Sequence, residues 1–110
     1  MMAKHEFGIM QNAPKSRKRY DEYEPHKYNC ISVDDDYVEI MNANLKNVDF
    51  YWHTVDVPAK GIAYTGITLI PPTSIESIVA VIKNITELNE LKELFMKALA
   101  ENKWVIHFGL

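Results

Sequence analysis

Histidine and acidic side chains are the groups with which this chain could carry out proton-transfer or metal chemistry. His53 and Asp56 stand three residues apart in an aromatic-rich segment, and His107 lies near the C-terminal end. Side chains alternate across a strand, so a spacing of three places His53 and Asp56 on opposite faces. His107 is predicted to lie on the opposite edge of the sheet from His53 and could meet it only between two copies of the chain. One or two isolated histidines do not make a zinc site, so we assign no catalytic residue and no metal ligand.

Three consecutive aspartates and a single cysteine have simpler interpretations than chemistry. Asp34, Asp35 and Asp36 precede an expected helix, where carboxylates satisfy free N–H groups and complement the helix dipole. Their spacing is not that of a calcium-binding loop. Cys30 is the only cysteine, so it cannot form an intrachain disulfide, and no neighbouring base is identified for it. We expect an inert, partly buried thiol.

Composition predicts one domain that can bury a core. The chain has 110 residues, of which 47% are hydrophobic, and a formal net charge of −3. The acidic balance argues against general affinity for nucleic acid or anionic membranes. Residues 1–11 lack the apolar run of a signal peptide, and no apolar stretch is long enough to span a membrane. We therefore expect a cytoplasmic protein, with no cofactor indicated.

The order of predicted elements suggests a ferredoxin-like fold. Strands are expected at 30–33, 49–57, 62–70 and 104–108, with helices at 35–46 and from Thr73 onward, the second one broken near Thr86. This βαββαβ succession predicts an α+β domain with a four-stranded antiparallel sheet and its helices on one face. The predicted domain covers residues 30–110. Residues 1–29 are expected to form an N-terminal arm, because 11–29 show no periodicity and the possible strand at 5–10 contains Gly8.

The arm contains a basic cluster at residues 15–19, followed by Tyr20 and Tyr23. Such a cluster could contact phosphates and stack bases. Acidic residues at 21, 22 and 24 nearly cancel this charge, so a solvated arm is the preferred interpretation.

Residues 60–67, Lys-Gly-Ile-Ala-Tyr-Thr-Gly-Ile, carry a pattern found on one strand of some RNA-binding domains. They resemble the RNP1 motif of RNA-recognition domains, [KR]-G-[FY]-[GA]-F-V-x-[FY]. Lys60, Gly61 and Ala63 match, and Tyr64 is an acceptable aromatic, whereas Ile62 and Ile67 replace aromatic residues. The resemblance implies binding of single-stranded RNA, with Tyr64 stacking on a base.

Both faces of the predicted sheet are apolar, so something must cover the face that the helices leave open. The N-terminal segment or a second copy of the chain could do so. The sequence thus favours a non-catalytic binding or protein-interaction module, a homodimer or a complex with another protein, with no membrane contact. An RNA-binding domain and a small dimeric α+β barrel enzyme using His53 or His107 are the alternatives. Residues proposed for ligand or partner binding are Trp52, His53, Tyr64 and Trp104, which come from both sheet faces.

Overall fold

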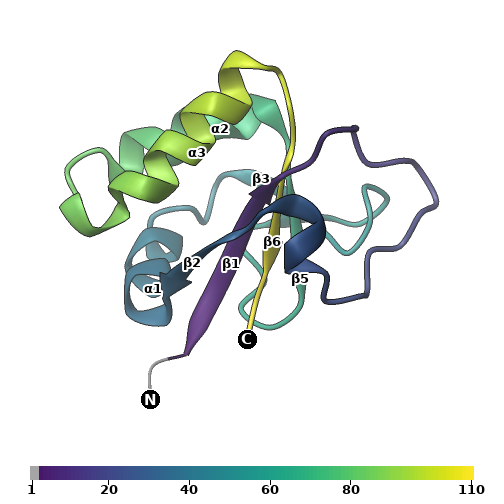
Figure 1. Ribbon diagram of the computed structural model, residues 1–110, viewed down its shortest axis with the longest axis horizontal. Helices are drawn as coiled ribbons and strands as arrows, with labels where there is room; N and C mark the ends of the chain where they lie inside the picture. The colour runs from purple at the N-terminus through teal and green to yellow at the C-terminus, as the bar shows by residue number, and fades with distance from the viewer. Residues whose placement is uncertain (1–2) are drawn as a thin grey trace.

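The computed structural model describes residues 3–110 and places one six-stranded antiparallel sheet against three α-helices (Figure 1). The spatial order of the strands is β2-β1-β6-β5-β3-β4. The strands are β1 (Lys4–Ile9), β2 (Ile31–Asp34), β3 (Asp49–Trp52), β4 (Pro58–Lys60), β5 (Ile67–Ile70) and β6 (Val105–Phe108). The helices are α1 (Asp35–Ala43), α2 (Pro72–Ile82) and α3 (Asn89–Ala100), with short 3-10 helices η1 (Pro25–Tyr28) and η2 (Thr86–Leu88).

The predicted four-stranded ferredoxin-like sheet with a separate N-terminal arm is wrong, because the first strand of the chain belongs to the sheet. β1 lies between β2 and β6 and forms an antiparallel ladder with each of them. The strand predicted at 30–33 therefore becomes the edge strand β2. Gly8 had argued against a strand at this position, since glycine weakens strand interiors, but here it serves close packing of the backbone. The broader α+β description still applies.

The strands predicted at 49–57 and 62–70 are both shorter than expected. β3 stops where His53 adopts a φ of 64°, and the residues between the two predicted strands form β4. Gly61 and Gly66 have φ values of 80° and 111° and enclose a loop that delays the start of β5. Positive φ cannot continue an extended strand, so these three positions shorten the two expected strands to β3 and β5 and leave β4 between them.

The helices cover one face of the sheet, and α2 and α3 pack side by side (Figure 1). Pro72 is the first residue of α2, a position where its missing N–H removes no helical hydrogen bond. The break expected near Thr86 lies between α2 and α3, at η2. Among residues 3–110, no helix is both long and apolar enough to cross a membrane.

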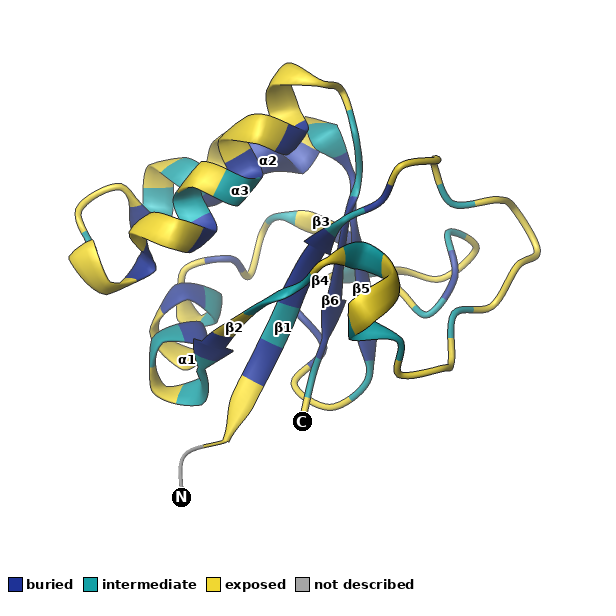
Figure 2. Cartoon of the chain, viewed as in Figure 1, coloured by how far each residue is buried: buried dark blue, intermediate teal, exposed yellow. Residues whose placement is uncertain are grey.

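The main hydrophobic core lies between the sheet and the helices, where the inward faces of both layers are buried (Figure 2). Burying one large apolar side chain contributes about 1.5–3 kcal/mol, so this layer provides much of the stabilisation of the fold. Its fully buried side chains include Phe7, Met41, Leu45, Phe50, Ile75, Ile78, Ile82 and Phe95.

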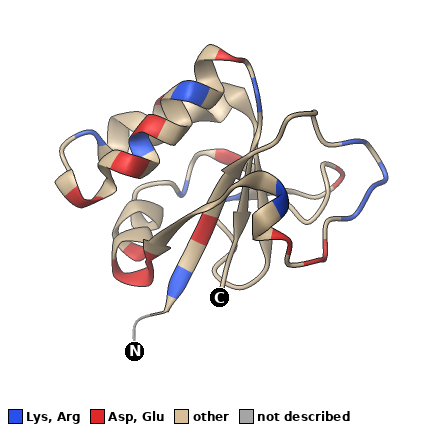
Figure 3. Cartoon of the chain, in the orientation of Figure 1, with Lys and Arg blue, Asp and Glu red and all other residues tan. Residues whose placement is uncertain are grey.

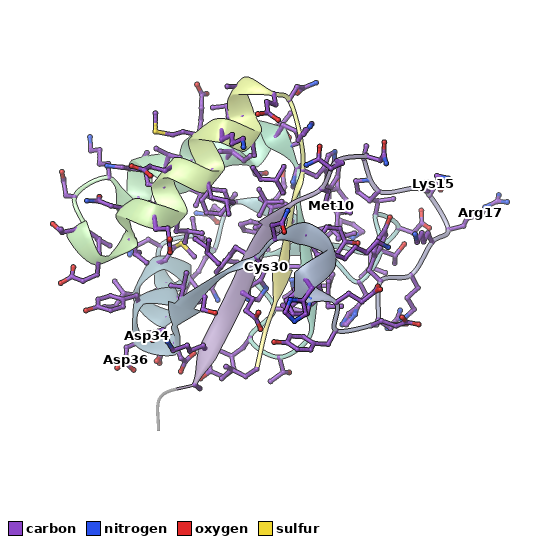
Figure 4. All side chains as sticks on the ribbon, in the orientation of Figure 1. Met10, Lys15, Arg17, Cys30, Asp34 and Asp36 are labelled. Carbon is purple, nitrogen blue, oxygen red and sulfur yellow. The ribbon has the colours of Figure 1, made fainter. Side chains whose placement is uncertain are left out.

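A second, smaller core covers the opposite sheet face. Met10, from the start of the connection between β1 and β2, is buried there with Phe108 and other side chains of β5 and β6, and Cys30, from its end, packs against them (Figure 4). The Tyr28 ring lies 6.1 Å from the ring of Phe108. The chain's own N-terminal segment thus covers the face that the helices leave open. A second copy is not needed to bury it, and the homodimer stays a prediction.

The basic cluster lies on the outer turn of this covering segment, at the edge of the molecule (Figure 3). Lys15 and Arg17 point away from the body of the protein (Figure 4). Asp56, in the loop between β3 and β4, holds the turn in place, because its carboxylate accepts hydrogen bonds from the Arg17 backbone N–H at 2.8 Å and from the Ser16 hydroxyl at 3.3 Å. The predicted arm is therefore hydrogen-bonded to the loop that follows β3.

Gly8 is where the covering segment crosses β1 most closely. A Cβ atom at this position would lie 2.7 Å from the carbonyl oxygen of Tyr28 and 2.7 Å from Cys30 Sγ. We expect Gly8→Ala to lower the free energy of unfolding by about 1–3 kcal/mol, as overpacking does in other cores. Urea unfolding measures this, with Ser32→Ala on the exposed side of β2 as the matched control. An unchanged midpoint for Gly8→Ala would show that the segment does not cross β1 at this distance.

Candidate functional site

Three buried polar side chains form a row across the helix-facing side of the sheet. His107 of β6 is paired with Thr68 of β5 on one side and with Phe7 of β1 on the other. His5 lies two residues before Phe7, so it is the diagonal neighbour of His107 on the same face. His5, Thr68 and His107 each have 0% of their surface exposed, in a layer otherwise made of apolar side chains.

A continuous chain of hydrogen bonds connects this row to the surface. Thr68 Oγ1 lies 3.1 Å from His107 Nδ1, and His107 Nε2 lies 2.8 Å from His5 Nδ1. His5 Nε2 lies 2.8 Å from Asp35 Oδ1. The Tyr64 hydroxyl donates to Asp35 Oδ2 at 2.6 Å and is the exposed end of the chain. Among the described residues, no buried side-chain nitrogen or oxygen lacks a partner.

The two groups on either side of the histidine pair in this hydrogen-bond chain, Thr68 and Asp35, determine which atoms carry protons. Asp35 as a carboxylate only accepts, so His5 donates through Nε2, and in the neutral ring its Nδ1 accepts from His107 Nε2. His107 Nδ1 then accepts from the Thr68 hydroxyl, whose oxygen in turn accepts the Ala63 N–H at 2.9 Å. Every donor therefore has an acceptor with both imidazoles neutral, and all the side-chain hydrogen bonds point from the core toward Asp35.

Electrostatics supports this arrangement of protons. Burial, with a smaller contribution from His5, holds the pKa of His107 well below its usual 6.5. The hydrogen bond from Tyr64, followed by that from His5, lowers the pKa of Asp35. The same Asp35 hydrogen bond is the main cause that raises the pKa of Tyr64 to about 12. At neutral pH Asp35 is therefore ionised, and Tyr64 and His107 are neutral.

Segments far apart in sequence position these side chains. Asp35 is the first residue of α1, and its backbone N–H donates to the carbonyl of Ala3 at 2.9 Å, which fixes the start of the helix beside β1. Tyr64 lies in the loop between β4 and β5. This loop is attached to the C-terminal residues through the Leu110 N–H, which donates to the Tyr64 carbonyl at 3.0 Å.

A groove of ≈ 460 Å³ runs between α1 and residues 60–64, with Tyr64 at one end. Val38 and Ile62 are buried and form its floor. The Asn42 side chain holds the two walls together, because it accepts the Ile62 N–H at 2.8 Å and donates to the Ile62 carbonyl at 3.2 Å. Its size is within the range of about 300–1,000 Å³ typical of ligand pockets.

The aspartates at the start of α1 play a different part from the one expected. Asp34 is the N-cap residue but makes no side-chain capping bond, and Asp35 is committed to His5 and Tyr64. Oxygen atoms of Asp35, Asp36 and Glu39 lie within 4.8 Å of one another, a spacing that a cation could bridge. Figure 4 shows Asp34 and Asp36 at the outer end of α1.

The lone cysteine agrees with its expected inert role. Cys30 is partly buried, and burial raises the pKa of its thiol to about 12. The thiolate, which is the nucleophilic form, is therefore scarce at neutral pH.

The four residues predicted to bind a ligand or partner lie in different places. Tyr64 lines the groove, and Trp52 supports it from outside by donating its indole N–H to the Gly61 carbonyl at 3.0 Å. Trp104 packs on Tyr51 at the opposite sheet face, with ring centroids 5.7 Å apart. His53 lines another pocket, next to Gly66 and the C-terminus.

His53 is held in an uncommon backbone conformation, with a φ of 64°. Its backbone N–H donates to the Ile67 carbonyl at 2.9 Å, and its ring Nδ1 lies 3.1 Å from the Tyr20 carbonyl. Asp21 Oδ1 lies 3.2 Å from the same ring nitrogen. His53 and Asp56 do not meet, as their spacing predicted, and His107 instead contacts His5 within one chain.

Sequence reasoning missed His5, Asp35 and Thr68 as members of a site. The sequence places the strand that carries His5 in the predicted arm, outside the sheet. The sequence contains one signal for it. His5 lies two residues before Phe7, so on a strand it shares the face of Phe7 that packs against the apolar core, where a polar side chain is unusual. No sequence pattern links it to Asp35, because only the β1–β2 ladder brings the two together.

The stretch that resembles the RNP1 motif does not lie on one strand. Lys60 ends β4, Ile67 begins β5, and the residues between them form the loop that carries Tyr64. Base stacking in RNA-recognition domains uses aromatic residues on the sheet surface, whereas Tyr64 lies beside α1.

Comparisons with known proteins yield no match: no family model, no curated protein and no solved structure matches this chain.

Thr68 tests the inner end of the hydrogen-bond chain. In Thr68→Val the shape is kept, but His107 Nδ1 and the Ala63 N–H both lose their partner. We expect the free energy of unfolding to fall by about 1–3 kcal/mol, the usual effect of leaving buried polar groups unsatisfied. Thr65→Val, at an exposed position, is the control and should change it by less than about 0.5 kcal/mol. If both variants lower the free energy of unfolding equally in urea, Thr68 does not form these buried hydrogen bonds.

His107 makes stability depend on pH in a defined window. The unfolded chain binds a proton at this imidazole below pH 6.5, whereas the folded chain does not until its lowered pKa is reached. Stability therefore falls as pH decreases from 6.5, by up to about 1.4 kcal/mol per pH unit for this one group. We expect His107→Gln to flatten the pH dependence of stability between pH 6.5 and 5, while the exposed control His26→Gln keeps it.

In the wild type, the NMR signal of the His107 ring should not titrate between pH 8 and 5.5. A normal titration there would show that the folded protein does not lower the pKa of His107.

Proposed function

We propose that this chain is a small-ligand binding module whose site is the groove between α1 and residues 60–64. The observation that carries this proposal is the way in which Tyr64 is held. Its side chain is 46% exposed at the end of the groove, yet its hydroxyl is oriented by Asp35, which is itself oriented by buried His5. Binding residues supported by a second layer of hydrogen bonds are pre-organised for contact with a ligand.

The shape of the groove supports the same proposal. An apolar floor with a few fixed polar groups is the usual composition of a small-molecule site. Here the floor is Val38 and Ile62, and the fixed polar groups are Asn42 and Tyr64. Because the Asn42 clamp joins the loop to the helix, the groove needs no rearrangement before a ligand enters.

The pKa shifts favour binding over proton-transfer catalysis. An effective general acid or base has a pKa close to the working pH. Asp35 is shifted downward and Tyr64 upward, so each is moved away from neutrality, and His107 is fully buried. A phenol that stays protonated and oriented is suited to packing against a ligand and to donating a hydrogen bond.

A fragment screen tests the proposal. We expect cationic, anionic, neutral and zwitterionic fragments, added to ¹⁵N-labelled protein, to include compounds that shift the amide signals of α1 and residues 60–64. Ala43→Trp, which fills the groove from its exposed edge, should abolish these shifts. Ile40→Trp, on the same helix but outside the groove lining, should leave them unchanged. The proposal fails if no fragment shifts these amides, or if the shifts persist in Ala43→Trp.

A further inference from the structure

We propose that the groove takes a dipolar ligand, with an ammonium group at the Tyr64 end and a carboxylate at the opposite end. This inference rests on the proposed function, since it names the class of ligand for the same groove. A short extended peptide with free termini, such as a tripeptide, is a molecule of this kind.

The direction of the two walls places opposite charges at the two ends. Along α1, the lining residues Glu39, Asn42 and Ala43 follow the spacing of one helical stripe, and Lys46 lines the groove from the turn after the helix. Residues 60–64 run antiparallel to this stripe, because Tyr64 bonds to Asp35 at the start of the helix and Ile62 bonds to Asn42 further along. Lys60 is therefore at the same end as Lys46, and Tyr64 is at the same end as Glu39.

The charges at the two ends remain available for a ligand. Within residues 3–110, neither Glu39 nor Lys46 forms an ion pair or a side-chain hydrogen bond. Lys60 is paired with Asp49, so Lys46 carries the uncompensated positive charge at its end. At the other end, the negative charge of Glu39 acts on the Tyr64 hydroxyl together with that of Asp36. An ammonium group there would contact carboxylates and the face of the Tyr64 ring, both of which attract cations.

The distance between the two ends sets the length of the ligand. Glu39 lies on α1, which rises 1.5 Å per residue, and residues 39–43 alone span about 6 Å along its axis. Lys46 follows three residues after Ala43, the last residue of the helix, so a ligand that meets both charges needs a spacer between its own two charged groups. Three residues of extended peptide provide such a spacer, at about 3.3 Å per residue. Between the two charges the floor is apolar, which favours an apolar side chain in the middle of the ligand.

Titration of ¹⁵N-labelled protein with the peptide Ala-Leu-Ala tests the inference. The free peptide should shift the amides of α1 and residues 60–64, and N-acetylation or C-amidation should each weaken binding about two- to five-fold, as expected for partly exposed charge pairs. Glu39→Gln should weaken binding of the free peptide but not of the acetylated one. Lys46→Gln should weaken binding of the free peptide but not of the C-amidated one. Lys83→Gln, exposed beyond the end of α2, is the control and should have no effect.

The outcomes separate the two proposals. Equal binding of free and doubly capped peptide would overturn the dipolar ligand and leave the groove as a binding site. Fragments that bind the groove while Ala-Leu-Ala does not would have the same meaning. If no fragment of any charge class shifts the groove amides, the proposed function itself fails, and this inference fails with it.

Discussion

The arrangement of the site depends on one constraint: two imidazole rings are buried in an apolar layer, and every ring nitrogen needs a partner. An unpaired polar group inside a protein costs about 1–3 kcal/mol, and a buried charge costs more. His5 and His107 meet this requirement through each other, and they need a hydroxyl at one end and a carboxylate at the other. Thr68 and Asp35 supply these groups, so the position of β5 and the start of α1 are tied to the same pair of rings.

That requirement also explains why the groove is well defined. Asp35 has two carboxylate oxygens, one of which is used by His5 and the other by Tyr64. The buried pair thus fixes the carboxylate, the carboxylate fixes the phenol, and the phenol fixes the end of the loop between β4 and β5. The surface feature is determined by side chains that no ligand could reach. Such support holds a binding residue in place at a lower entropic cost than an unsupported surface tyrosine would have.

The sequence predicted local features of this molecule better than its topology. The break near Thr86 could be recognised because the apolar stripe changes phase there, and periodicity is a local property. The central strand β1 could not, because its stability comes from ladders with β2 and β6, whose residues lie up to about a hundred positions away. The division of the predicted strand at 62–70 followed from positive φ at Gly66, which composition alone does not reveal. The sequence predicts Tyr64 as an aromatic on a strand, yet in the structure it lies in a loop and bonds to Asp35.

The covering segment shows how one close contact decides between two architectures. The sequence left open whether the second sheet face would be covered by the N-terminal segment or by another copy of the chain. Glycine at position 8 allows the backbone at Tyr28 to approach β1 more closely than any Cβ would permit. The segment then lies flat, and Met10 and Tyr28 reach Phe108 and its neighbours on β5 and β6. The apolar side chains of that face are covered by the chain itself, and the groove beside α1, on the other side of the sheet, combines a cavity with charged groups that can meet a ligand.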